Sequence, residues 1–300
     1  MKQLTLKAIR NKLKRHYNEL LGITPVLCGP FEQRIKCRHL AYWKHADAET
    51  IRNTSMSALD PIENWMDVPH WQRKLSNKHN AREFAVMHAC MVSELYWKGR
   101  DLELLDFTVL PENFVIRPTI GHSSGLVFLM RKGVNLMDKK SYTTEAIKEI
   151  LKKALEKNRY LEFLVEEFLT DEKGQYRIPD DYKFYTFNGE IAIIQVINRL
   201  GPREGFDSCY DAAWNQMPDI SAHYPPAARQ LPPQCLPEMI AQVKKLSKAY
   251  GVFVRVDFYA TPRGAVFGEF TPTPGLGKSF TPMAEQLFID NWGKHCAGTI

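Results

Sequence analysis

The segment "VRVDFYATPRGAVFGEFTPTPG", residues 254–275, reads as two β-strands joined by a tight turn. Valine, phenylalanine and alanine dominate both strands, as expected for strands that pack on a hydrophobic core. Asp257 and Glu269 interrupt these apolar runs. Because acidic side chains are rarely buried unless their charge is compensated, the two acids need a compensating partner within or beside the strand pair.

The turn determines which side chains share a face of the two strands. The sequence "TPRG", residues 261–264, is typical of a type I turn followed by a left-handed glycine, and it predicts a three-residue loop that pairs Thr261 with Ala265. Counting back from this pair gives two opposed pairs on one face, Asp257 with Glu269 and Arg255 with Thr271. The other face is then apolar, with Val254, Val256, Phe258, Val266 and Phe270. A two-residue loop would place the two acids on opposite faces.

Two carboxylates directly across a strand pair lie about 5 Å apart at Cβ and repel each other. A Mg²⁺ ion shared with the phosphate oxygens of a substrate would compensate this repulsion, with Arg255 adding positive charge beside it. A shared proton or a structural salt bridge with Arg255 would also do so. The residues alone leave these three alternatives open.

Length and composition set the broad class of the protein. The 300 residues are 44% hydrophobic, enough for two or three lobes with real cores. The six cysteines are scattered and form no CxxC motif, which favours free thiols in a reducing compartment, and we expect the cytoplasm. No run of residues approaches the roughly 18–20 apolar residues of a membrane-spanning helix, so no stable membrane insertion is expected.

The formal net charge is +6, and its densest part is an amphipathic basic helix expected over residues 2–21. Such a helix could bind RNA or an anionic membrane surface, but a solvated helix face is the more common reason for the pattern. No nucleic-acid-binding module is recognisable, so no nucleic-acid partner is expected. The oligomeric state is open.

Hydrophobic periodicity predicts an α+β protein. Residues 22–72 are expected to be irregular, residues 79–99 to begin as a helix and end as a short strand, and the proline-rich residues 223–234 to form an exposed loop. Further helices are expected over 143–157, over 236–249 and from near Pro282. Further strands are expected over 113–117, 126–130, 161–168, 182–187 and 190–197. Tight turns between strands favour antiparallel sheets over a doubly wound parallel sheet.

Three further segments are candidates for binding chemistry. The sequence "RPTIGHSSG", residues 117–125, combines a cation with glycines and serines, a composition that suits either a phosphate-binding loop or a plain hairpin loop. Glu166 and Glu167 end a buried strand, which could hold a purine and a ribose or simply face solvent. The "NG" turn at residues 188–189 predicts a hairpin that carries Lys183 on a half-buried face, where it would need an anion, unless it is an exposed edge lysine.

Taken in order, these segments resemble the ATP-grasp superfamily over about residues 75–295. The segments "SNKHNAREFAVMHACMV", "RPTIGHSSG", "VRVDFY" and "EFTPTPG" are similar to D-alanine:D-alanine ligases. The segment "DYKFYTFNGE", together with the opening strand pair, is more similar to the ATP-grasp proteins of teichuronopeptide and related cell-surface polymer biosynthesis. The resemblance implies two α+β lobes that clasp ATP, over residues 73–165 and 166–300, after a helical and irregular N-terminal segment over residues 1–72.

The resemblance also implies roles for individual residues. Lys78, Arg117 and Lys183 would contact the phosphates of ATP, and Gly121, Ser123, Ser124 and Gly125 would form a loop that closes over them. Glu166 and Glu167 would lie at the adenine and ribose. Asp257, Glu269 and Thr271 would hold Mg²⁺, and Arg255 would act with Lys183 in catalysis by steadying an acyl intermediate. Arg117 stands where lysine is usual, and Thr271 stands where many members have asparagine.

The activity implied by the resemblance is ADP-forming ligation of a carboxylate to an amine through an acyl phosphate. The expected substrates are an amino acid or small peptide and a saccharide, peptide or amino acid acceptor, in cell-surface polymer or secondary-metabolite biosynthesis. Two alternatives stay open: phosphoryl transfer to a hydroxyl group, and nucleotide binding without catalysis.

Overall fold

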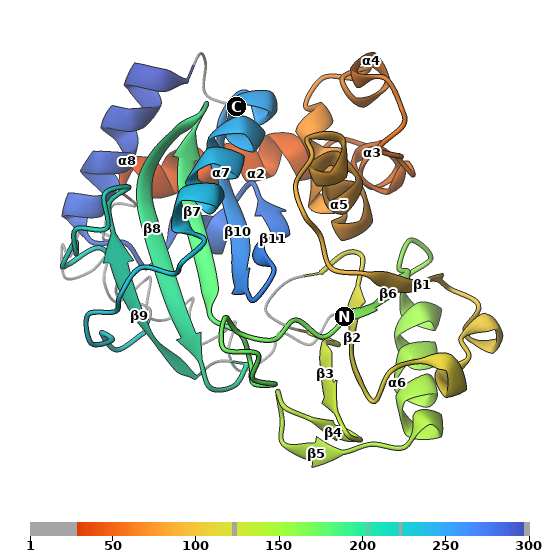
Figure 1. Cartoon of the computed structure of the whole chain (residues 1–300). Coiled ribbons are helices and arrows are strands. Elements are labelled where there is room, and N and C mark those ends of the chain that lie inside the picture. Colours follow the sequence, from red (N-terminus) through yellow and green to blue (C-terminus); the bar gives the residue numbers. More distant parts are fainter. Residues whose placement is uncertain (1–28, 122–124, 203, 222–223, 297–300) are drawn as a thin grey trace, which may run out of the picture.

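The computed structural model describes residues 29–121, 125–202, 204–221 and 224–296, and it contains two antiparallel sheets (Figure 1). One sheet has six strands in the order β1-β6-β2-β3-β4-β5, and the other has five in the order β11-β10-β7-β8-β9. Each sheet carries its own helices, which gives two lobes. The α+β expectation is confirmed. Within the described residues, no helix is both long and apolar enough to cross a bilayer.

The six-stranded sheet forms the first lobe. Its strands are β1 (Leu95–Gly99), β2 (Asn113–Pro118), β3 (Phe128–Arg131), β4 (Val134–Asn135), β5 (Lys140–Ser141) and β6 (Phe163–Glu167). Helix α6 (Thr144–Lys157) packs on this sheet through Ile147 and Leu151, and its first turn is capped by Thr143, whose hydroxyl accepts from the Ala146 amide. Two short 3₁₀ turns, η2 (Leu102–Leu104) and η3 (Phe107–Val109), connect β1 to β2.

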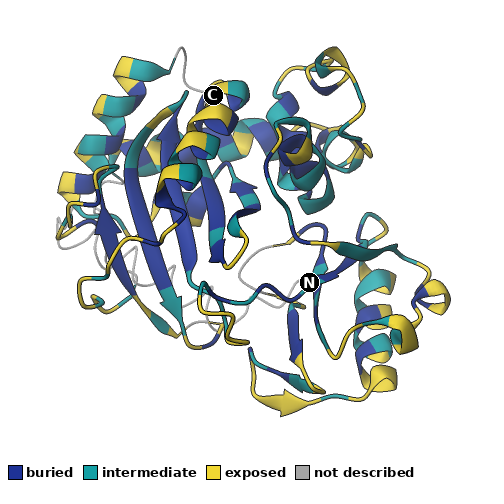
Figure 2. Cartoon of the chain, viewed as in Figure 1, coloured by how far each residue is buried: buried dark blue, intermediate teal, exposed yellow. Residues whose placement is uncertain are grey.

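The five-stranded sheet forms the second lobe. Its strands are β7 (Asp181–Phe187), β8 (Glu190–Arg199), β9 (Gly205–Tyr210), β10 (Phe253–Thr261) and β11 (Gly264–Thr271). Helix α7 (Leu236–Tyr250) covers one face, and α2 (Pro30–Trp43) and α8 (Pro282–His295) lie on the other (Figure 1). The strands are buried at the centre of this lobe, whereas the helices expose their outer faces (Figure 2).

The expected "NG" hairpin is confirmed. Asn188 and Gly189 both have positive φ, 49° and 100°, and they join β7 to β8 by a two-residue turn. Positive φ at both central positions is what a type I′ turn needs, and asparagine followed by glycine adopts it at low cost. Strand β9 was not expected from the sequence, because "GFDSCY" lacks a run of β-branched residues.

The β10–β11 hairpin differs from its expected form at the turn. Thr261 pairs with Gly264, so the loop has two residues rather than three. A β-bulge then restores the expected register, because Asp257 pairs with Glu269 while Phe258 pairs with Phe267, which leaves Gly268 as the extra residue. Both acids therefore share one face, as predicted, but for a different reason.

The bulge also changes the apolar face of the hairpin. Val266 pairs with Tyr259 and so lies on the face of the acids, although it is fully buried, which corrects its expected place on the opposite, apolar face. Phe267 takes that place instead, with its ring centroid 5.8 Å from that of Phe258. A residue inserted by the bulge reverses the alternation of side chains between the bulge and the turn.

Residues 30–65, expected to be irregular, contain helices. These are α2, α3 (Ala48–Asn53) and α4 (Ile62–Trp65), followed by the 3₁₀ turn η1 (Trp71–Ser76) and α5 (Lys78–Met87). Tertiary packing explains them, since Phe31 of α2 contacts the rings of Phe253, Phe288 and Trp292 in the second lobe. The basic helix expected over 2–21 lies outside the described residues.

Candidate active site

Arg255 lies at the centre of the hairpin face that carries the acids. Its Nε and Nη2 atoms donate to the two carboxylate oxygens of Asp257, both at 2.7 Å. Nη2 also lies 3.2 Å from Glu269 Oε1 and 2.9 Å from Thr271 Oγ1. The structure therefore brings together all four residues that the register predicted, and Arg255 bridges the two acids.

Lys183 approaches the same carboxylate from the neighbouring strand. Strand β7 pairs with β10 so that Lys183 is opposite Asp257, and Lys183 Nζ lies 2.6 Å from Asp257 Oδ2. Lys183 is only 6% exposed and Asp257 only 2%. The expectation of a lysine on a buried face with an anionic partner is borne out by this contact, and the alternative of an exposed edge lysine is wrong.

Two residues that the sequence reasoning missed extend this network. Asp181 Oδ2 lies 3.6 Å from Lys183 Nζ and accepts from Arg199 Nη2 at 2.7 Å. Asp181 lies two residues before Lys183 in the same strand, so the period-two alternation of a strand already placed both on one face. That signal could have identified Asp181; Arg199, near the end of β8, has no comparable signal.

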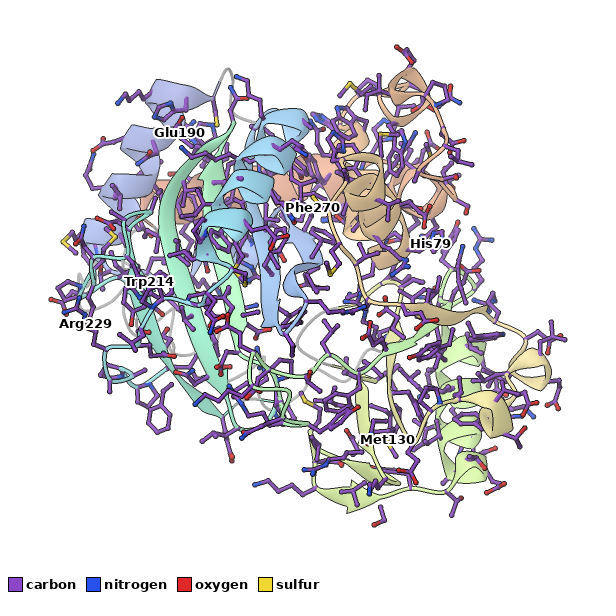
Figure 3. The ribbon with its side chains drawn as sticks, in the orientation of Figure 1. His79, Met130, Glu190, Trp214, Arg229 and Phe270 are labelled. Atoms are coloured by element: carbon purple, nitrogen blue, oxygen red, sulfur yellow. The ribbon has the colours of Figure 1, made fainter. Side chains whose placement is uncertain are left out.

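Two further cations, carried by α5 and β2, approach the acids from outside the five-stranded sheet. Lys78, at the start of α5, has its Nζ atom 3.8 Å from Glu269 Oε2 and 3.5 Å from the carbonyl oxygen of Gly121. Arg117 of β2 donates through Nη1 to the carbonyl of Gly268 at 3.4 Å. In Figure 3, the labelled residues His79 and Phe270 mark the start of α5 and strand β11, which carry Lys78 and Glu269.

The two acids at the end of β6 have different surroundings. Glu166 is 2% exposed and accepts from Arg117 through Nε and Nη2, and from Ser93 Oγ at 3.1 Å. Glu167 instead pairs with Arg263 at the tip of the β10–β11 hairpin, at 2.6 Å. Glu166 therefore contacts the cation Arg117, which also reaches the β10–β11 hairpin, whereas Glu167 does not contact Arg117.

The glycine and serine loop is described only at its ends. Gly121 has φ +141°, in the region that favours glycine, and its carbonyl faces Lys78. Gly125 is exposed at the other end. Ser123 and Ser124 lie outside the described residues, so the expectation of a phosphate-binding loop stays a prediction.

The charges around the acids shift their ionisation. Burial by itself raises the pKa of Glu269, but the cations Lys78, Arg255 and Lys183 outweigh burial and bring this pKa below its usual value. Burial likewise opposes ionisation of Asp181, and Lys183 and Arg199 lower its pKa nonetheless. Burial lowers the pKa of Lys78, in spite of the nearby charge of Glu269.

Among the described residues, the network contains more cations than acids. The cations are Lys78, Arg82, Arg117, Lys183, Arg199 and Arg255, and the acids are Glu166, Asp181, Asp257 and Glu269. A buried surplus of positive charge creates a potential that attracts a multiply charged anion. The arrangement suits a polyphosphate better than a neutral ligand.

The donor set also fits one Mg²⁺ ion completed by phosphate oxygens. Glu269 is ionised, its side chain is 30% exposed, and its oxygens lie 3.2 Å and 3.8 Å from their nearest cations. Those contacts are longer than the 2.7–2.9 Å usual for charged hydrogen bonds, so Glu269 can turn toward a metal. Among the described residues, no group of three or more His, Cys, Asp or Glu side chains is placed to hold a metal ion.

Comparison with solved structures shows similarity in fold. A structure of D-alanine–D-alanine ligase from Bacillus anthracis is similar at 15% identity and TM-score 0.50, over 74% of this chain and 67% of that chain. A second structure of that enzyme, complexed with ATP, has 14% identity and TM-score 0.48, over 74% and 65%. An L-amino acid ligase from Bacillus licheniformis has 14% identity and TM-score 0.46, over 72% and 48%.

The chain spans about two thirds, or less, of the length of these enzymes. No curated protein gives a significant match. A model of the family described as TupA-like ATPgrasp matches residues 69–289, which include the strands of both sheets and every residue of the cationic network. Since this match covers well over half of the chain, the chain belongs to the TupA-like ATP-grasp family, and its two lobes are those of the ATP-grasp fold.

Proposed function

We propose that the protein is an ADP-forming carboxylate–amine ligase that uses ATP and Mg²⁺. The observation that carries the proposal is the network around Arg255, Asp257, Glu269 and Lys183, placed where the two lobes meet. Its surplus of cations supports polyphosphate binding. Its composition suits positioning and charge neutralisation, which dominate phosphoryl-transfer catalysis.

The residues of this chain would divide the work as follows. Lys78, Arg117 and Lys183 would hold the phosphate oxygens of ATP, while Asp257 and Glu269 would hold Mg²⁺, with Thr271 beside them. Mg²⁺, when bound, supplies neutralisation of the phosphate charge. Glu166 and Glu167 stay candidates for the nucleoside end of the site.

The reaction would proceed in two displacements. A carboxylate oxygen of the first substrate attacks the γ-phosphorus of ATP, ADP leaves, and an acyl phosphate forms. The amine nitrogen of the second substrate then attacks the carbonyl carbon, the C–O bond to phosphate breaks, and the amine loses a proton as the amide forms. Arg255 would stabilise the negative charge on the acyl phosphate and on the tetrahedral intermediate.

The proposed substrates are an amino acid or small peptide and an amine on a saccharide, peptide or amino acid, in the assembly of a cell-surface polymer or a secondary metabolite. We propose that the protein acts in the cytoplasm. The described cysteines, Cys37, Cys90, Cys209, Cys235 and Cys296, are all free, as a reducing compartment would leave them.

A screen of ADP release over pairs of amino acids and amino sugars or sugar acids, in the presence of Mg²⁺, tests the ligase proposal. Release that requires both members of a pair supports ligation. Hydroxylamine distinguishes ligation from phosphoryl transfer to a hydroxyl group. It traps an acyl phosphate as a hydroxamate, whereas phosphoryl transfer to a hydroxyl gives no hydroxamate. ATP binding without ADP release for any pair would favour the non-catalytic alternative.

We predict that Lys183→Met abolishes ADP release and keeps the fold. The lysine holds phosphate in this proposal, and methionine fills a similar volume on the buried face of β7. Turnover and circular dichroism of the variant check the prediction. Lys152→Met, an exposed lysine on α6, is the control. Near-normal turnover by Lys183→Met would remove the β7–β8 hairpin from the nucleotide site.

A further inference from the structure

Arg38 of α2 is a cation buried in an unusual setting. It is 0% exposed, and among the described residues it forms no ion pair. Its guanidinium lies over the ring of Trp292, 4.6 Å from the centroid, and 5.5 Å from the ring centroid of Phe253. Its Nε and Nη2 atoms are buried without a hydrogen-bond partner.

Nη1, the third nitrogen of the Arg38 guanidinium group, connects the ends of β10 and β11. Nη1 donates to the carbonyl oxygen of Phe253 at 2.6 Å and to that of Pro272 at 3.2 Å. Phe253 begins β10, and Pro272 directly follows the end of β11. A single guanidinium nitrogen therefore spans the open end of the hairpin, opposite its turn.

The need for such a bridge follows from the sequence of β11. The ladder between β10 and β11 ends at the pair Arg255 and Thr271. Pro272 comes next and has no N–H, so it cannot donate the hydrogen bond that would continue the ladder. Arg38 instead donates to one carbonyl on each strand, those of Phe253 and Pro272, just beyond the last pair of the ladder.

The same helix also fixes the loop that follows β11. The 3₁₀ turn η4 (Pro274–Gly277) contains Gly277 with φ +76°, and a Cβ on Gly277 would lie 2.6 Å from Cα of Glu32 in α2. The backbones of the helix and the loop are therefore in close contact. Helix α2 contacts both the end of β11 and the turn beyond it.

We propose that Arg38 is a positioning residue that closes the open end of the β10–β11 hairpin, so that Arg255 and Thr271 stay in register for the proposed ligase reaction. The inference rests on the proposed function for its catalytic consequence, but not for the bridge itself. Helix α2 then belongs functionally to the second lobe, although it lies before the residues that the family model matches.

Stability alone gives a weaker reason for an arginine at this position. A buried guanidinium without an acid is costly, and its two unsatisfied nitrogens add to that cost. A methionine would fill similar space beside Trp292 without a buried charge, but it could not bridge the two carbonyls. The bridge is what distinguishes the positioning role from ordinary core packing.

The experiment compares Arg38→Met with Arg34→Met. Arg34 is the matched control, because it lies one turn earlier on α2 and its guanidinium also lies over Trp292, at 4.9 Å, but within the described part of the chain it shows no hydrogen bond to the strands. Hydrogen exchange of the amides in residues 253–257 and of Thr271, Thr273 and Gly275 reports opening of the hairpin end that the bridge closes. Turnover and the KM for ATP, per folded molecule, report its catalytic effect.

For Arg38→Met we expect exchange to be accelerated at these two segments and not across the whole lobe. Because a misplacement of about 1 Å can reduce a rate about 100-fold, kcat should fall by one to two orders of magnitude. The KM for ATP should change little, since Lys78 on α5 and Arg117 on β2 make no contact with Arg38 among the described residues. Arg34→Met should leave exchange and kcat as in the wild type.

The bridge would be refuted if Arg38→Met exchanged its amide hydrogens at both segments as slowly as the wild type. It would also be refuted if the variant's hydrogen exchange were accelerated evenly over the chain. Local acceleration with unchanged kcat would overturn the catalytic consequence. If Arg38→Met does not fold, Arg38→Lys carries the same comparison with a smaller expected change, because an ammonium keeps a donor but lacks the planar fork. A wild type without ATP turnover would refute the proposed function, while the exchange data would still decide the bridge.

Discussion

Asp257 and Glu269 are directly opposed across two strands, yet their surroundings differ. Asp257 is 2% exposed and accepts three hydrogen bonds from Arg255 and Lys183, at 2.6–2.7 Å. Glu269 has a side chain that is 30% exposed, with longer contacts. The salt bridge and the metal site, which the sequence left as alternatives, are therefore compatible here. Asp257 is held by close contacts with cations, whereas Glu269 makes only longer contacts and is the acid better placed to turn toward a metal.

This difference predicts unequal costs of removing each charge. Asp257→Asn should lower the free energy of unfolding without ligands by about 3–5 kcal/mol, because it leaves buried cations without their acid. Glu269→Gln should cost less than about 1 kcal/mol, as for exposed pairs. Urea unfolding of both variants measures these changes in the free energy of unfolding. In an activity assay, both variants should lose Mg²⁺-dependent turnover. An Asp257→Asn variant as stable as the wild type would show that the acids are a repelling pair that only a metal relieves.

Asp181 gives a pH-dependent prediction. Its pKa in the folded protein lies below the value of about 3.9 expected when unfolded, because Lys183 and Arg199 outweigh the effect of burial. Its contribution to stability is therefore complete above the unfolded pKa and is lost as the pH falls through the folded pKa.

Asp181→Asn should accordingly be less stable than the wild type at pH 7, by about 3 kcal/mol for a broken buried pair. The difference should narrow below about pH 4 as the wild-type carboxylate is protonated. Urea unfolding between pH 3 and pH 7 checks this, with the exposed Asp290→Asn on α8 as control. A difference that stays constant with pH would contradict the ionic role of Asp181.

At the scale of elements, the β10–β11 hairpin shows how far sequence reasoning reaches. Alternation and the acids at 257 and 269 correctly predicted the opposed pairs of the site. The pattern could not locate the bulge, because a glycine at the turn, Gly264, and a glycine in the strand, Gly268, each allow an inserted residue. With the bulge at Gly268, Phe267 packs against Phe258 and Phe270, a tertiary contact that the local sequence pattern does not contain.

Helices over residues 30–65 were missed for a related reason. Helix α2 has no side-chain cap and only a weak amphipathic pattern, so its sequence carries little local signal. Its stability comes from Phe31 and Arg38 packing on strands and helices more than 200 residues away. By contrast, α6 has a Thr143 cap and a clear apolar stripe, and it was predicted nearly to its ends.

The bulge predicts a specific effect of substituting Gly268. A Cβ at this position would lie 3.0 Å from the ring of Tyr259 and 3.1 Å from the carbonyl oxygen of Asp257. Gly268→Ala should therefore destabilise the protein by about 1–3 kcal/mol and weaken turnover, because the hairpin must shift. Thermal unfolding compared with Gly293→Ala is the test.

Gly293 is a suitable control because it lies in α8 with open space around it. Alanine there should stabilise the protein by up to about 1 kcal/mol, since glycine is unfavourable within a helix. If both variants were equally stable, the close approach at Gly268 would have no energetic consequence, and the register would have to be held elsewhere.

At the scale of the whole molecule, polar contacts join the six-stranded sheet to β11 and the turn before it. Arg117 of β2 reaches the Gly268 carbonyl, and Glu167 of β6 pairs with Arg263 at the hairpin tip. The division of the chain at residues 72 and 165 stays a proposal. Contacts of this kind permit relative motion of lobes, and a ligand bound between them would reduce it.

The charge balance at this junction leads to a prediction that needs no knowledge of the substrates. The net charge of the chain is +6, but the surplus of cations over acids in the network is concentrated where the lobes meet. A polyanion that bridges Lys78 of α5 and Lys183 of β7 binds only the folded protein. It should therefore raise stability by mass action, by about 2.7 kcal/mol at 100 times its dissociation constant.

Inorganic triphosphate should raise the melting temperature without Mg²⁺, whereas sodium chloride at equal ionic strength should not, because screening alone gives no specific contact. ATP with Mg²⁺ should raise it further than either alone, since Glu269 then gains a metal partner. Lys183→Met should lose most of the triphosphate effect, and Lys152→Met on α6 should keep it. Equal responses of the two variants would place triphosphate elsewhere on the basic surface, and the network would then hold its acids and cations for stability alone.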